Sequence, residues 1–134
     1  GNWRDPYLTM STHYEAQTAR ELAKLAEQTQ VVFFTHHAHL VDLAREAGLA
    51  IGKTGAIVVD EYLRTSDPLI FSGGDCVEIK NLVSDQPGYF PLGSMANRQG
   101  RVIGTNLAKG NATFKGAVGS FVVKIFEAAL AGPD

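Results

Sequence analysis

The sequence predicts an α/β fold: a three-layer domain with a mostly parallel sheet, helices on both faces and a β-rich C-terminal part. Three observations lead to this class. Short runs of β-branched and aromatic residues lack polar alternation, which is typical of strands covered on both faces. Amphipathic stretches flank the first of these runs. The length of 134 residues fits a single domain, 1–134, around one core.

The sequence of the N-terminal part predicts three elements in the order helix, strand, helix. Thr12 and Glu15 have the spacing of a capping box, and apolar residues then recur on one face, so we expect a helix over about 13–28. The apolar run 31–34 is a buried-type strand. A second amphipathic helix over 40–47 ends at Gly48, which can adopt the left-handed conformation that stops a helix.

The C-terminal part adds more strands. Residues 56–59 and 69–72 are predicted to be buried strands, and 77–91 a hairpin or long loop around a turn. Ser94 is the expected N-cap of a helix to about residue 109, in which small residues recur every four positions. Residues 121–126 predict a last strand, followed by one alanine-rich turn, so we expect the chain to stop within an element and to be truncated.

Composition excludes several classes of partner. The formal charge is -2 and the Lys and Arg residues are scattered along the chain, so we expect no nucleic acid and no membrane partner. No apolar run approaches the roughly 18 residues of a membrane span, and no secretory signal is seen, which predicts a cytoplasmic protein. The single cysteine, Cys76, excludes a dithiol pair within the chain.

Two further motifs are weak indications of a phosphate-binding loop and of a metal site. Gly52-Lys53-Thr54 follows Gly48 with three intervening residues where a phosphate loop needs four, and it precedes a strand rather than a helix. The cluster of His36, His37 and His39 lacks the spacing of a helical zinc pair, so no metal site is predicted. His36 remains a candidate polar group at the carboxyl end of a strand.

Gly73-Gly74-Asp75 is the stronger candidate for a ligand site. It follows the predicted strand 69–72 at the strand's carboxyl edge, where open α/β sheets bind ligands. Two glycines allow a close approach of the backbone, and an aspartate adds an acceptor.

Residues 48–130 resemble the FAD-contacting C-terminal part of pyridine nucleotide-disulfide oxidoreductases of the NADH oxidase and coenzyme A-disulfide reductase type. The resemblance is carried by residues 65–76 (Thr-Ser-Asp-Pro-Leu-Ile-Phe-Ser-Gly-Gly-Asp-Cys) and extends to 54–64 and 91–100. It implies FAD as the cofactor, with Asp75 on the ribityl chain and helix N-terminal amides of 92–94 at the flavin ring. The cofactor-binding candidates are Gly74, Asp75, Cys76, Leu92, Gly93 and Ser94.

No catalytic residue follows from the resemblance. The chain has no Gly-x-Gly-x-x-Gly turn for the FAD pyrophosphate or the nicotinamide cofactor. The family's redox cysteine has no counterpart either, and Cys76 should not take that role. We therefore expect a partial FAD-binding segment without independent catalysis.

Residues 13–47 resemble a different class, the C-terminal segment of chromosome-segregation-type P-loop ATPases, through 23–37 with His36 or His37 as a phosphate sensor. The Walker B acid pair of that class is missing. A join near 43–49 between an ATPase-like segment (1–47) and a flavin-reductase-like segment (48–134) is therefore expected. The alternatives are one natural fold, a chimeric domain without cofactor or activity that dimerises through exposed sheet edges, and a nucleotide-binding remnant.

Overall fold

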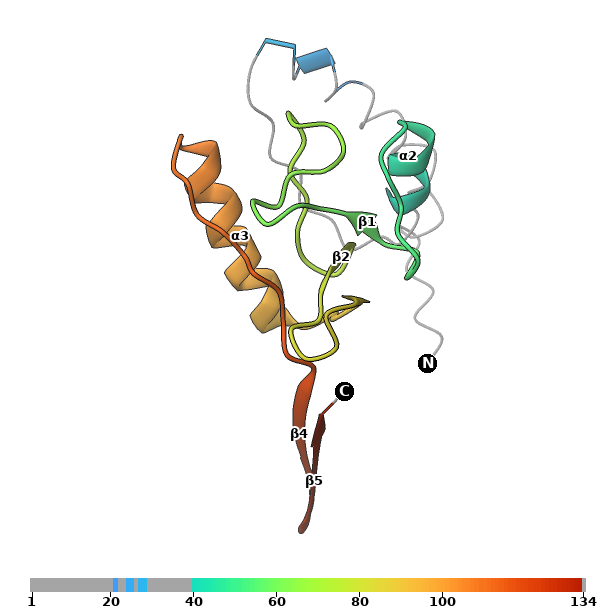
Figure 1. Cartoon of the computed structure of the whole chain (residues 1–134), viewed down its shortest axis with the longest axis vertical. Helices are drawn as coiled ribbons and strands as arrows, with labels where there is room; N and C mark the ends of the chain where they lie inside the picture. The colour runs from blue at the N-terminus through green and yellow to red at the C-terminus, as the bar shows by residue number, and fades with distance from the viewer. Residues whose placement is uncertain (1–20, 22–23, 26, 29–39, 134) are drawn as a thin grey trace, which may run out of the picture.

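The computed structural model describes residues 21, 24–25, 27–28 and 40–133 (Figure 1). Their order is α2 (Leu40–Glu46), β1 (Ile57–Val58), β2 (Val77–Lys80), β3 (Pro87–Gly88), α3 (Gly93–Leu107), β4 (Ser120–Ile125) and β5 (Ala128–Pro133). The α/β class is thus confirmed. Most of the predicted helix 13–28, the strand 31–34 and the three clustered histidines lie outside the described residues. Within the described part, no helix has the length and hydropathy needed to cross a bilayer.

The central sheet has three short strands in the order β1-β2-β3. β1 and β2 are parallel, with Ile57 opposite Val77, whereas β2 and β3 are antiparallel. The sheet is therefore mixed among the described residues, and the predicted three-layer arrangement stays a prediction. In Figure 1 these strands lie between α2 and α3.

The core gathers side chains from segments far apart in the sequence. Six buried residues form one cluster: Leu63, Val77, Ile79, Phe90, Phe114 and Ala117. Met95, Val102 and Ile103 of α3 pack against this cluster, so α3 is attached to the sheet through its apolar side. Burial of such side chains contributes about 1.5–3 kcal/mol each.

Several predicted elements are confirmed. α2 ends at Glu46, and Gly48 has φ +84°, as expected for a left-handed helix stop. The predicted strand 56–59 contains β1, and 77–91 is the hairpin of β2 and β3 around a turn at 81–86. The predicted strand 121–126 corresponds to β4.

The predicted strand 69–72 is wrong. Its single ladder contact is the bridge between Arg64 and Phe71, inside a narrow loop. The Asp67 side chain accepts a hydrogen bond from the Leu69 amide at 2.9 Å, and the Asp67 carbonyl accepts one from Ile70 at 3.0 Å. These bonds close a turn at the start of the apolar run, so most of the run cannot pair with the sheet.

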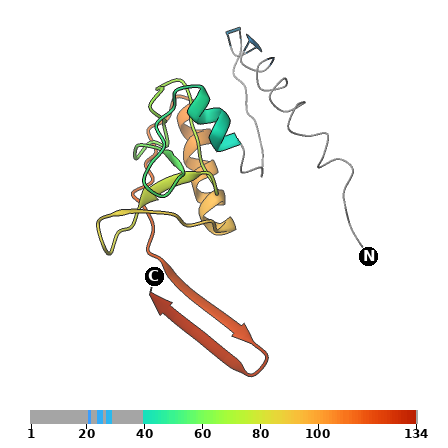
Figure 2. The same ribbon diagram turned by 90° about the vertical axis from the view of Figure 1, so that its right-hand side faces the viewer.

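The predicted N-cap and the predicted tail are also wrong. The N-cap of α3 is Leu92, two residues before the predicted Ser94, and it has no side-chain cap, so Ser94 lies inside the first turn. The tail is the strand β5, which pairs with β4 from Ser120–Pro133 to Ile125–Ala128. Figure 2 shows this β4–β5 hairpin projecting from the rest of the described chain.

Candidate functional site

The loop of residues 72–76 is anchored on α3 by a buried side chain. The Gly74 amide donates a hydrogen bond of 2.6 Å to Oε1 of Gln99. Gln99 is 1 % exposed, although it is polar and lies in the middle of a helix. A buried amide side chain needs partners, and this bond supplies one while fixing the loop.

The two glycines of the loop allow this contact. A Cβ on Gly73 would lie 2.8 Å from Cδ1 of Ile103 and 3.3 Å from Cβ of Gln99, so a side chain there requires the end of the Ile103 side chain to move. Gly74 has φ +91°, which favours glycine, and a Cβ on it would lie 3.7 Å from Cβ of Ala96. The close backbone approach expected from Gly73-Gly74 is therefore directed at α3.

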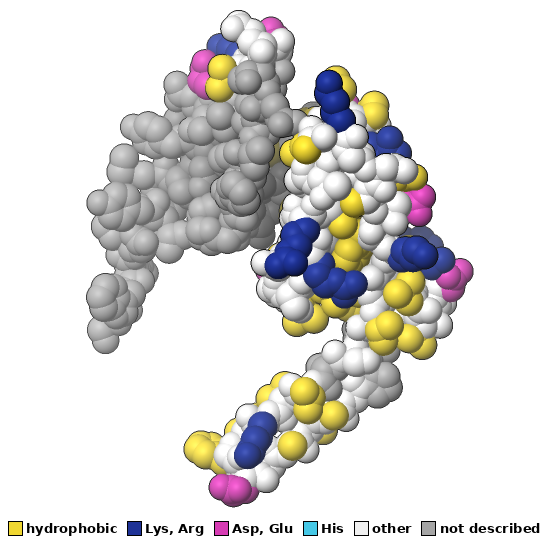
Figure 3. Space-filling view, turned by 90° about the vertical axis from the view of Figure 1, so that its left-hand side faces the viewer, with side chains coloured by type: hydrophobic (Ala, Val, Ile, Leu, Met, Phe, Trp, Pro, Cys, Tyr) yellow, Lys and Arg dark blue, Asp and Glu magenta, His cyan; other side chains and the backbone are white. Residues whose placement is uncertain are grey.

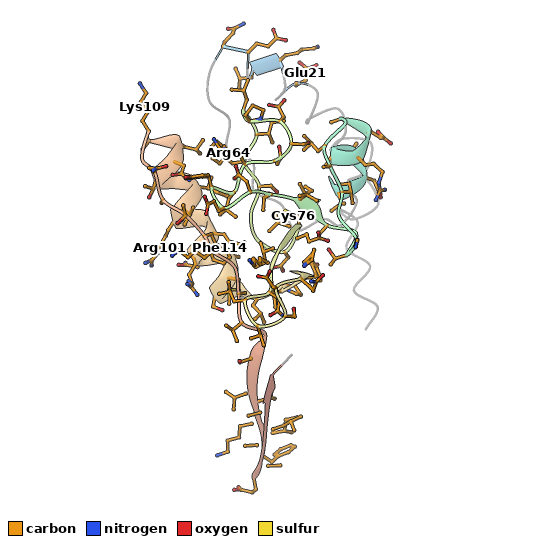
Figure 4. All side chains as sticks on the ribbon, in the orientation of Figure 1. Glu21, Arg64, Cys76, Arg101, Lys109 and Phe114 are labelled. Carbon is orange, nitrogen blue, oxygen red and sulfur yellow. The ribbon has the colours of Figure 1, made fainter. Side chains whose placement is uncertain are left out.

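Asp75 and Cys76 have different surroundings. Asp75 is exposed, whereas Cys76 is half-buried and packs against the core cluster. The Cys76 thiol lies 3.3 Å from the Ser72 hydroxyl, and the Cys76 carbonyl accepts a hydrogen bond from the Ile57 amide at 2.9 Å. Cys76 thus ties the loop to β1 (Figure 4), while Asp75 is accessible to solvent.

The start of α3 supplies backbone donors. Its N-cap Leu92 accepts hydrogen bonds from Met95 at 2.9 Å and Ala96 at 3.0 Å. The amides of Gly93 and Ser94 have no acceptor among the described residues, and the first turn holds no acidic residue. Uncapped amides and the positive end of the helix dipole favour an electron-rich group here. Because Gly74 lies against Ala96, the loop and the start of α3 are neighbours.

Sequence reasoning missed the residues that hold this arrangement together. Gln99 is one, and a polar residue on the helix face that carries Ile103 was its only signal. Glu78 is another: it is 8 % exposed and accepts hydrogen bonds from the Thr54 amide at 2.8 Å and hydroxyl at 2.7 Å. Because the Thr54 amide is occupied by Glu78, the Gly52-Lys53-Thr54 segment is a structural turn before β1.

A charged turn follows β1 and is separate from the loop that carries Asp75. Asp60 accepts hydrogen bonds from the amides of Tyr62 and Arg64, both at 2.9 Å, and pairs with the Arg64 guanidinium at 2.7 Å. Partial burial raises the pKa of Asp60, but the hydrogen bonds and charge of Arg64 outweigh it, so the pKa lies below its ordinary value. The turn holds Leu63, at φ 65° and 1 % exposure, in the core.

Comparisons with known proteins identify the class of protein and the family to which this chain belongs. The solved structures that match include oxidoreductases: a FAD-dependent pyridine nucleotide-disulphide oxidoreductase from Desulfovibrio vulgaris has 67% identity and a TM-score of 0.66 over 69% of this chain. A NAD-dependent persulfide reductase from A. fulgidus has 50% identity and a TM-score of 0.67, also over 69%. The family model of pyridine nucleotide-disulphide oxidoreductases matches residues 16–100. The chain therefore belongs to the pyridine nucleotide-disulphide oxidoreductase family.

The chain corresponds to a limited part of these relatives. An NADH oxidase from Methanocaldococcus jannaschii is 38% identical over 109 residues, which is 81% of this chain and 24% of the relative. The chain spans 23% and 17% of the two solved proteins. The family match extends through the predicted join at 43–49. Neither the resemblance of 13–47 to P-loop ATPases nor the chimera gains support from these matches.

Proposed function

We propose that this chain is the FAD-contacting segment of a pyridine nucleotide-disulphide oxidoreductase, without catalysis of its own. The observation that carries the proposal is the neighbourhood of an exposed carboxylate, Asp75, and an uncapped helix start, joined by the Gly74–Gln99 hydrogen bond. When bound, FAD would supply the redox chemistry, and the chain would supply binding and orientation.

Each proposed contact has a defined chemistry. The Asp75 carboxylate would accept hydrogen bonds from ribityl hydroxyl groups, a role implied by the family resemblance. The amides of Gly93 and Ser94 would donate hydrogen bonds to the flavin ring, where the helix dipole favours electron density. Gly74 keeps the loop close to α3, and Leu92 positions the helix start. Cys76 would act through the shape of the loop, because its thiol is turned toward Ser72.

The site in this chain is incomplete. A Cβ at Gly100 or Gly104 would meet nothing within 4 Å, so this side of α3 is open. The sequence has no Gly-x-Gly-x-x-Gly turn to hold the pyrophosphate. The chain covers less than a quarter of the solved D. vulgaris protein, at 23%. We therefore propose that a further FAD-binding segment completes the site and that FAD binding by this chain alone is weak.

The experiment is a fluorescence titration of FAD with the purified chain, followed by gel filtration and a visible absorption spectrum. We expect weak binding that is lost on gel filtration, and roughly tenfold weaker affinity for Asp75→Asn, on the order of one charge-assisted hydrogen bond. The matched control is Asp67→Asn, whose carboxylate belongs to the turn before Ile70. It should leave FAD binding unchanged.

Different results of the FAD titration would contradict different parts of the proposal. Equal FAD affinity for Asp75→Asn and the wild-type chain would contradict the role of Asp75. A stoichiometric yellow complex after gel filtration would contradict the incomplete site. A folded chain that never changes FAD fluorescence would instead favour the cofactor-free alternative.

We also propose that the chain is cytoplasmic and forms a homodimer. The β4–β5 hairpin supports the dimer, because four of its apolar side chains are more than half exposed: Val122, Ile125, Phe126 and Leu130. A two-stranded hairpin is marginally stable by itself, and a second copy would cover its apolar surface.

A further inference from the structure

Charge is strongly segregated along this chain. Residues 86–126 contain five Lys and Arg residues and no Asp or Glu. The remaining seven of the 12 Lys and Arg and all 14 Asp and Glu lie outside this segment, which gives that remainder a formal charge of -7. The whole-chain charge of -2 therefore hides a cationic segment within an acidic protein.

The structure brings most of these cations to one exposed surface. We call it the α3 face and define it by Arg98 and Arg101 of α3 and by Lys109 and Lys115 of the loop that follows; all four are exposed. Figure 3, in which the side of the molecule that carries α3 faces the viewer, shows several separate dark blue side chains on this side. α3 has 15 residues and is about 22 Å long, and Arg98 and Arg101 lie in its middle part.

Among the described residues, the cations of the α3 face take part in no ion pair. The ion pairs found among the described residues join Glu21 with Lys24, Asp42 with Arg45, Asp60 with Arg64, and Lys80 with Asp85. None of these pairs involves the α3 face. Arg98 is also held in place, because its guanidinium lies 5.6 Å from the centre of the Phe114 ring. An arginine fixed in this way loses less side-chain entropy when it binds a carboxylate.

We propose that the α3 face binds an acidic surface on a partner protein. Arginine pairs with carboxylates through two parallel hydrogen bonds, and Arg98 and Arg101 are three residues apart on one helix, so they can engage neighbouring carboxylates. Each exposed ion pair contributes less than about 1 kcal/mol, so the affinity depends on several pairs together. Such a surface mainly increases the association rate and selects the partner by charge.

A protein fits this surface better than a nucleic acid. The one aromatic residue in 92–118 is Phe114, and it is buried, so the α3 face offers no ring for stacking on bases. A long polyanion would also extend beyond the α3 face onto the remainder of the chain, whose formal charge is -7. A compact acidic patch matches the limited size of the face.

The test uses fluorescence anisotropy of a labelled peptide made of glutamate, serine and glycine, titrated with the chain at low and at high salt. We expect binding at low salt that weakens as salt is added, and no binding of the same peptide with glutamine in place of glutamate. Arg98→Gln combined with Arg101→Gln should weaken binding about tenfold. Arg101→Gln combined with Lys115→Gln, which leaves Arg98 on Phe114, should have a similar effect.

The matched control is Arg45→Gln combined with Lys53→Gln, which removes the same charge from the acidic remainder. At about 0.1 M salt this control should bind the peptide within about twofold of the wild-type chain, because charges beyond a Debye length of about 10 Å are then screened. Equal losses in the control and the α3-face variants would overturn the proposal, because net charge alone would then explain binding. Tighter binding of a double-stranded DNA than of the peptide would also overturn it.

Discussion

The amide of Gly74 and the side-chain oxygen of Gln99 form a hydrogen bond of 2.6 Å that joins the candidate ligand loop to α3. The bond links residues 25 apart in the sequence, and a Cβ on the neighbouring Gly73 would lie 2.8 Å from Cδ1 of Ile103 on the same helix. This hydrogen bond therefore helps to fix the position of Asp75 relative to the start of α3, together with the packing of Gly73 and Gly74 against the helix.

Gln99→Met tests the contact with little change of side-chain volume. The part-buried Gly74 amide would lose its acceptor, so we expect the free energy of unfolding to fall by about 1–2 kcal/mol. Urea unfolding followed by circular dichroism measures this change. The control is Asn97→Met, an exposed position on the same helix, which should change stability by less than about 0.5 kcal/mol. Equal effects at both positions would show that the hydrogen bond does not hold the loop.

Alanine substitutions at two glycines should act in opposite directions. Gly73→Ala would place a methyl group 2.8 Å from Cδ1 of Ile103, so we expect a loss of about 1–3 kcal/mol. Gly100→Ala places its methyl group in open space inside a helix, so we expect a gain of about 0.5–1 kcal/mol. Thermal unfolding of the two variants beside the wild-type chain gives both signs. A stabilised Gly73→Ala variant would mean that the loop does not press against α3.

Local patterns in the sequence predicted the elements whose stability is local. The helix stop at Gly48, the strand around Ile57 and the hairpin of β2 and β3 all follow from turn residues and short apolar runs. The pair Gly73-Gly74 was interpreted as an approach of the backbone to a ligand, whereas the structure shows it close to α3. The neighbour of that loop, Gln99, could not be predicted, because the pairing depends on how α3 packs in three dimensions.

The elements that were missed depend on tertiary contacts. β5 consists of alanine, leucine, glycine and proline, which have little intrinsic strand preference, and it is a strand because β4 pairs with it. The run 69–72 has strand composition, yet Leu69 is 87 % exposed because the Asp67 turn directs it away from the sheet. The cationic segment 86–126 could have been found from the sequence by counting charge in segments rather than over the whole chain.

Acid should weaken the turn around Asp60. The pKa of Asp60 lies below its ordinary value of 3.8, so the folded state binds this proton less readily than the unfolded state. The stabilisation is therefore complete above about pH 4 and is lost as the pH falls through the lower folded-state pKa. Asp60→Asn should lower stability at neutral pH, with a difference from the wild-type chain that shrinks below about pH 4.

Unfolding midpoints measured as a function of pH check the prediction for Asp60. The control is Asp42→Asn, which removes another aspartate that pairs with an arginine three residues away, at an exposed helix surface. That pair should contribute little, because exposed ion pairs are worth about 0–1 kcal/mol. A destabilisation by Asp60→Asn that stays constant from neutral pH to strong acid would contradict the ionisation argument.

Self-association should depend on the β4–β5 hairpin. Val122 and Leu130 are 75% and 66% exposed, and threonine at both positions would provide a β-branched side chain while removing apolar surface. We expect the double variant Val122→Thr with Leu130→Thr to shift the chain from dimer to monomer, measured by gel filtration with light scattering over a range of concentrations. Leu69→Thr, which changes a residue 87% exposed outside the hairpin, should leave the dimer intact. A wild-type chain that is monomeric at every concentration would contradict the homodimer, and a double variant that remains dimeric would place the interface elsewhere.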